Sequence, residues 1–84
     1  MINKLIELLR NMPEPKTIFD RYAIYGVVMS ILSEIEVGID KKEALDCLAE
    51  IKKDFSDRLL SDEVLTKEDL HNLSNHLPLL KLKL

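Results

Sequence analysis

The chain has 84 residues, of which 46% are hydrophobic and 32% are charged, and its formal net charge is −3. A chain of this length and composition predicts one domain, residues 1–84, with a single core, and excludes a disordered polypeptide. The longest apolar run, residues 22–32, is well short of the roughly 20 residues that cross a bilayer, and the lone thiol of Cys47 excludes an intrachain disulfide, so we expect a cytoplasmic protein without membrane association.

The first predicted helix covers residues 3–11. Its apolar residues recur at spacings of three and four until Pro13, which disfavours a helical residue directly before it. The second predicted helix covers residues 18–37 and ends at Gly38, which we expect to adopt a left-handed conformation. Because the middle of this helix is apolar nearly all round, we predict a central helix contacted on several sides.

The third predicted helix covers residues 41–60. Five apolar residues form an unbroken stripe along it: Ala44, Leu48, Ile51, Phe55 and Leu59. The fourth helix, residues 67–76, ends before Pro78, and residues 79–84 form an apolar tail that alternates like a strand or continues as irregular chain. These elements predict an all-α fold, a compact bundle of about four helices with one long central apolar helix.

Three of the predicted helix starts share one signal, a Thr or Asp followed three residues later by an acidic residue. The pairs are Thr17 with Asp20, Asp40 with Glu43, and Thr66 with Asp69. In such a capping box each side chain accepts a hydrogen bond from a backbone amide near the helix start. Because Glu reaches further back than Asp, we expect the Asp40 box to be the strongest.

Charge is distributed unevenly along the chain. From Glu34 to Asp69 there are twelve carboxylates against six Lys and Arg residues, a net charge of −6, whereas residues 1–33 carry +1 and residues 70–84 carry +2. This middle stretch would repel phosphate, so we expect no direct binding of nucleic acid. A protein with a basic surface is the more natural partner.

Five carboxylates of the third helix fall within one narrow band, roughly opposite the apolar stripe. They are Glu43, Asp46, Glu50, Asp54 and Asp57. One interpretation is a solvated face, partly neutralised by Lys42 with Asp46, Lys53 with Asp57, and Arg58 with Asp54. The other interpretation is a docking surface, where complementary charge speeds encounter with a basic protein and helps to select it.

Apolar residues offer two further candidate contacts. The leucines of the tail, Leu80, Leu82 and Leu84 among them, either close this chain's own bundle or insert into a partner. On the second helix, Tyr22, Tyr25 and Met29 are spread around the axis, so three short neighbours would leave some of them uncovered. A symmetric homodimer would bury that remainder.

Signals for catalysis or metal binding are weak. The only glycines are Gly26 and Gly38, so there is no glycine-rich phosphate loop. Glu68 and His71 have the spacing of half a di-iron site, but the second pair is missing. Cys47 borders the apolar stripe without an evident basic neighbour. We therefore expect no enzymatic activity, no metal and no cofactor.

The leading hypothesis is a non-enzymatic acidic helical protein that binds another protein, most concretely an inhibitor, immunity or antitoxin-like protein that covers a basic enzyme such as a nuclease. The alternative is a homodimeric regulatory or assembly module, linked to transcription, that associates through the second helix. A helix-turn-helix DNA reader is disfavoured because the third helix has the wrong charge.

Overall fold

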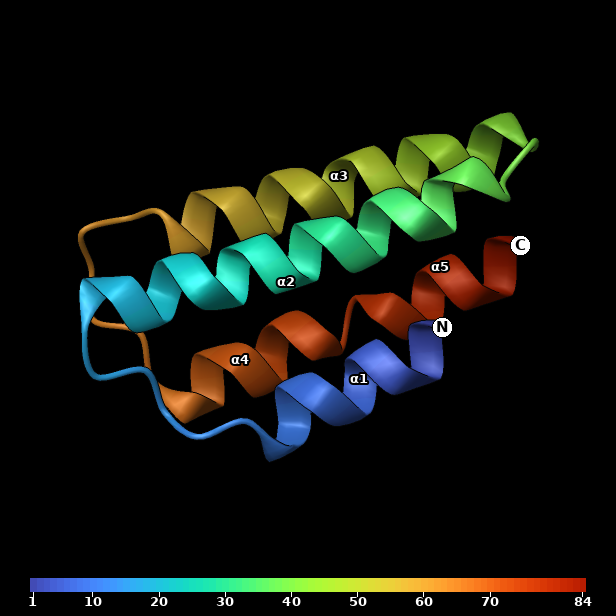
Figure 1. The fold of residues 1–84 in the computed structure, drawn as a ribbon. Coiled ribbons are helices and arrows are strands. Elements are labelled where there is room, and N and C mark those ends of the chain that lie inside the picture. Colours follow the sequence, from blue (N-terminus) through green and yellow to red (C-terminus); the bar gives the residue numbers. More distant parts are fainter.

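A computed structural model describes all 84 residues and contains five α-helices and no strand. The helices are α1 (Ile2–Asn11), α2 (Ile18–Val37), α3 (Lys42–Leu59), α4 (Lys67–Ser74) and α5 (Leu77–Lys83). They form two layers: α2 and α3 make an antiparallel hairpin, and α1 lies beside the nearly continuous α4 and α5 (Figure 1). The prediction of a compact all-α bundle is confirmed.

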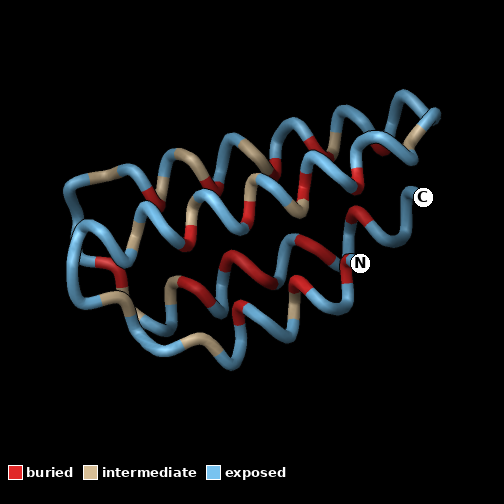
Figure 2. Tube along the Cα trace, viewed as in Figure 1, coloured by how far each residue is buried: buried red, intermediate tan, exposed pale blue.

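The core lies between the two layers, where buried positions of each layer face the other (Figure 2). Seventeen buried hydrophobic residues form a single cluster. All five residues of the apolar stripe of α3 belong to it, as their spacing predicts. From α1 the cluster takes Ile2, Leu5 and Leu9.

Two of the three predicted capping boxes are present. Thr17 Oγ1 accepts a hydrogen bond from the Asp20 amide at 3.1 Å, and Asp20 Oδ2 accepts one from the Thr17 amide at 3.1 Å. Thr66 and Asp69 form the same pair of bonds at the start of α4. Both boxes satisfy amides that have no partner within the helix.

The prediction for Asp40 is wrong. The capping residue of α3 is Lys41, and no side chain caps this helix. The helix starts one residue later than the box requires, so the carboxylate of Asp40 lies too early in the chain to reach the free amides. The conformation predicted for Gly38 is also wrong, since its φ is −89° and its ψ is 2°. The amides of Gly38 and Ile39 instead bond the carbonyls of Ile35 and Glu36, each at 3.1 Å, and this tightened last turn needs no left-handed residue.

Helix α2 is not covered on several sides, so its predicted central position is wrong. It buries only one side, through Ile24, Val28, Leu32 and Ile35. The helix belongs to an outer layer with α3 beside it and the other layer beneath it (Figure 1). The remaining helices are too short and too few to cover its outer side, which stays exposed.

The C-terminal tail is helical, which corrects the prediction of a strand or irregular chain. Asn75 and His76, between α4 and α5, keep right-handed helical backbone angles. Pro78 then falls in the first turn of α5, where its missing amide hydrogen is not needed. The helical period turns Leu77 and Leu80 into the core, while Leu82 is 84% exposed.

Two arginines form hydrogen bonds between segments that are distant in sequence. Arg21 on α2 donates to the carbonyl oxygens of Arg58 at 2.9 Å and of Leu59 at 3.1 Å, where its positive charge suits the end of α3. Arg10 on α1 donates through Nε to Oγ of the buried Ser74 at 3.3 Å. The first contact joins α2 to the end of α3, and the second joins α1 to the end of α4.

Candidate functional site

The acidic stripe consists of Glu43, Asp46, Glu50, Asp54 and Asp57 on α3, and all five side chains are exposed. The helix places them there because residues three and four apart share one side, and the apolar stripe holds a different side against the core. The five carboxylates thus lie on one exposed side of α3, as their spacing predicts.

The stripe divides into a paired half and an unpaired half. Near the end of α3, Asp57 lies 3.4 Å from Lys53 Nζ, as predicted, and Asp54 lies 3.5 Å from His76 Nδ1. The other three carboxylates, Glu43, Asp46 and Glu50, have no cationic nitrogen within 4 Å. The predicted pair of Lys42 with Asp46 is therefore not formed, and three successive turns of α3 present free negative charge.

The helical spacing predicts that Arg58 pairs with Asp54, and this prediction is wrong. The Arg58 guanidinium lies 2.8 Å from Asp69 Oδ2 and 2.8 Å from Glu63 Oε2. The start of α4 brings Asp69 against the end of α3, and this contact lowers the exposure of both side chains to about a quarter. Hydrogen bonds from the Thr66 amide and then from Arg58 hold the pKa of Asp69 below its usual value. The hydrogen bond that Arg58 donates to Asp69 raises the pKa of Arg58.

These contacts create an acid-lined groove next to the stripe, with a volume of about 400 Å³. Its lining is largely polar: Asp54, Asp57, Arg58, Ser61, Glu63, Asp69, Asn72, Leu73 and His76. Four of these residues are carboxylates, and two of the four belong to the stripe. The groove unites α3, the following loop and α4, so helical spacing within α3 alone could not reveal it; the only signal was the density of acids between Glu34 and Asp69.

The outer side of α2 is the second exposed surface. Phe19 is 78% and Tyr22 is 51% exposed, whereas Tyr25 and Met29 are partly buried and pack against the core cluster. Of the three α2 residues predicted as dimer contacts, the structure therefore leaves only Tyr22 largely free. Phe19 has the same exposure pattern but was missed, because it stands in the first turn, outside the apolar middle of the helix.

The structure separates the tail leucines by the helical period of α5. Leu80 is fully buried in this chain's own core, so it is not available to a partner. Leu82 and Leu84 are 84% and 48% exposed. Leu82 does not share a face with Leu80, because a helix does not place every second residue on the same side, whereas Leu84, four residues after Leu80, lies on the same side as Leu80.

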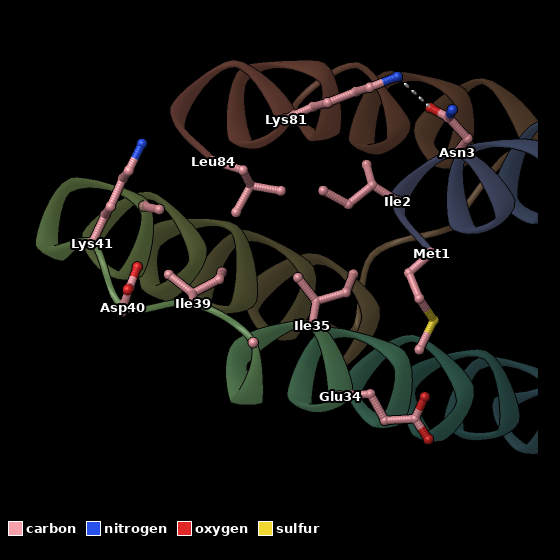
Figure 3. A pocket seen from close by; sticks show the side chains of 12 residues that line it. Met1, Ile2, Asn3, Glu34, Ile35, Ile39, Asp40, Lys41, Lys81 and Leu84 are labelled. Atoms are coloured by element: carbon pink, nitrogen blue, oxygen red, sulfur yellow. Dashed lines mark hydrogen bonds between the residues drawn. The ribbon is translucent and has the colours of Figure 1, made fainter.

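The largest cavity, about 500 Å³, opens between the first turn of α1, the α2–α3 turn and the end of α5 (Figure 3). Ile2, Ile35 and Leu84 point into it, and a hydrogen bond of 3.2 Å from Lys81 Nζ to Asn3 Oδ1 crosses its rim. No serine, cysteine or histidine lines it. The cavity thus offers an aliphatic floor with isolated charges at its edge rather than an assembled reactive group.

Other chemistry-bearing residues are not brought together. No group of three or more His, Cys, Asp or Glu side chains is arranged to hold a metal ion. None of the five helices combines the length and the apolar character needed to span a bilayer. Cys47 is a free, partly buried cysteine beside the core.

The fold and these surfaces define a class, a small two-layer all-α bundle with an acidic edge on α3 and an uncharged outer side on α2. Comparison with protein-family models, with curated proteins and with solved structures finds no significant match for the chain.

Proposed function

We propose that the chain is a non-enzymatic binding protein that docks on a basic surface of another protein through the acidic stripe and the adjoining groove. The observation that carries this proposal is the set of three neighbouring carboxylates, Glu43, Asp46 and Glu50, which have no cationic nitrogen within 4 Å. Like charges one turn apart destabilise a helix by roughly 0.2–0.5 kcal/mol per pair. A basic partner would relieve this repulsion.

The groove extends the same charge toward α4. Arg58 already engages two of its carboxylates, but Asp54 and Asp57 line both the stripe and the groove. A partner protein bound along the stripe would therefore have further acidic residues next to it, in the groove at the Asp57 end of the stripe. Steering by such a continuous field raises association rates, and packed side chains at the centre of the contact supply most of the affinity.

Within this class, an inhibitor, immunity or antitoxin-like protein is the most specific form of the proposal. A basic enzyme such as a nuclease has cations around its substrate site, and an acidic protein that covers them would compete with the substrate. The small size and helical build of this chain suit such a cover.

The test compares capture of partners from native lysate by three proteins: the wild type, a variant with Glu43, Asp46 and Glu50 changed to Gln, and a matched control with Glu7, Glu14 and Glu68 changed to Gln. All three controls are exposed carboxylates outside the stripe. We expect a basic protein that binds the wild type and the control alike and the stripe variant at least about tenfold more weakly at low salt, a difference of about 1.4 kcal/mol.

Added salt should reduce the difference between the two variants, because it screens exposed charge. For an enzyme partner, the wild type should also inhibit the reaction. Equal binding of the partner by the stripe variant and the control would reject the stripe as the docking surface.

A further inference from the structure

The outer face of α2 consists of six exposed, uncharged residues: Phe19, Tyr22, Gly26, Ser30, Ser33 and Val37. Successive members are three or four residues apart, so they lie on one side of the helix. From Tyr22 to Ser33 the helix carries no charged residue at all. A solvent-facing helix side is usually charged or polar, so this side has the character of a contact surface.

Gly26 is the least expected member of this face. Glycine within a helix is about 1 kcal/mol less favourable than alanine. Nothing inside the chain requires it, because a Cβ atom added at Gly26 would have no neighbour within 4 Å. With Ser30 one turn further on, it gives this face two small residues over which another helix can approach closely.

We infer that the outer face of α2 binds a second copy of this chain, as an antiparallel helix pair related by a two-fold axis at Gly26. Phe19 and Ser33 are each seven residues from Gly26, and Tyr22 and Ser30 are each four residues from it. Antiparallel pairing therefore sets the aromatic rings of one copy over the serines of the other. An interface related by a two-fold axis uses the same surface of both copies, so that surface must be complementary to itself. The outer face of α2 meets this requirement, because its aromatic half lies opposite its serine half.

Charge favours the antiparallel direction. Lys16, just before α2, and Glu36, near its end, are each ten residues from Gly26. Antiparallel helices bring Lys16 of one copy to Glu36 of the other at both ends of the contact, whereas parallel helices would set Glu36 against Glu36. The Glu36 side chain is 48% exposed although it bonds Lys52 at 2.7 Å, so it remains accessible to a second cation.

The exposed apolar side chains of this face supply part of the area that a dimer needs. Each partner of a stable interface contributes about 800 Å², which is roughly one seventh of the 5456 Å² of this chain. An aromatic side chain can bury about 200 Å², so Phe19 and Tyr22 at their observed exposure offer roughly 250 Å². Ile18, Val27 and Val37, all between 46% and 89% exposed, add to this area.

Two substitutions test the contact by mass in solution, measured from low to high micromolar concentration. The wild type should approach twice the chain mass of 9.7 kDa. Gly26→Glu would place two like charges at the axis and should raise the dissociation constant of the dimer at least about tenfold. It does not threaten the monomer, since the site is open and Glu is the better helix former. Leu82→Glu, at an exposed position of α5, is the matched control and should leave the dimer intact.

A cysteine variant tests the register. Gly26→Cys in a Cys47→Ser background should form a disulfide between copies under mild oxidation, because the axis brings the two Cα atoms within reach. Val37→Cys in the same background, far from the axis, should not. A wild type that stays monomeric at high micromolar concentration, a dimer that Gly26→Glu leaves unchanged, or equal cross-linking of the two cysteine variants would each overturn the inference. None of these residues belongs to the acidic stripe, so this result is independent of the test of the basic partner.

Discussion

Nη2 of Arg58 lies 2.8 Å from Oδ2 of Asp69, and this single contact joins the end of α3 to the start of α4. Asp69 accepts from the Thr66 amide at the same time, at 2.8 Å. One carboxylate therefore caps α4 and positions it against α3, which also shapes the acid-lined groove.

A double-mutant cycle measures this contact. Arg58→Met and Asp69→Asn are made singly and together, and the free energy of unfolding is obtained from urea titration. We expect a coupling of about 1 kcal/mol, because the bond is charge-assisted and both side chains are only about a quarter exposed. The capping role of Asp69 cancels in the cycle. The parallel cycle of Arg58 with Glu63, whose side chain is 79% exposed, should couple by less than about 0.5 kcal/mol. Equal couplings would contradict the special role of Asp69.

The same carboxylate predicts how stability depends on pH. The pKa of Asp69 is lowered from its usual 3.8, chiefly by the Thr66 amide and next by Arg58. The unfolded chain, with the higher pKa, binds the proton first as pH falls, so the contribution of Asp69 is complete above about pH 5 and is lost as pH falls through the folded-state pKa. Asp69→Asn should be less stable than wild type at pH 7 and should lose less stability between pH 5 and pH 2, as measured by urea unfolding at each pH.

Asp20, whose pKa is lowered by the amides of Lys16 and Thr17, should behave in the same direction. Glu7→Gln serves as the control for loss of a carboxylate, and it should leave the acid limb of the stability profile unchanged. An acid limb equally steep in wild type and Asp69→Asn would show that Asp69 does not act through its lowered pKa.

The capping box predicted at Thr66 is present and the one predicted at Asp40 is absent, so the two positions can be compared by one substitution at each. Thr66→Ala removes the acceptor for the Asp69 amide and should cost about 1 kcal/mol of the free energy of unfolding. Asp40→Ala should change it by less than about 0.5 kcal/mol, because no side chain caps α3. Thermal unfolding of both variants beside wild type is sufficient. A similar loss at both positions would restore Asp40 as a cap.

These caps show which features the sequence could predict. The Thr17 and Thr66 boxes and the apolar stripe of α3 depend on residues within one or two turns, so their spacing was enough. The partner of Arg58 depends on where α4 packs, and the exposure of α2 depends on how many other helices remain to cover it. Such tertiary relationships leave no periodic signal. The acidic stripe was therefore predictable from spacing along α3, whereas the adjoining groove was not.

The C-terminal tail distinguishes the side-chain period of a strand, two residues, from that of an α-helix, about 3.6 residues. Its alternating leucines and lysines favoured a strand, in which Leu80, Leu82 and Leu84 would share one face and contribute alike. In the helix α5, Leu80 is fully buried and Leu82 is 84% exposed. We therefore expect Leu80→Ala to lower the free energy of unfolding by about 2–4 kcal/mol, by loss of burial and formation of a cavity. Leu82→Ala should change it by less than about 0.5 kcal/mol. Since α3 packs against α5, the loss at Leu80 should also weaken the support beneath the acidic stripe. Equal losses for the two variants, measured by urea titration, would favour the strand period and would remove the helical account of the tail.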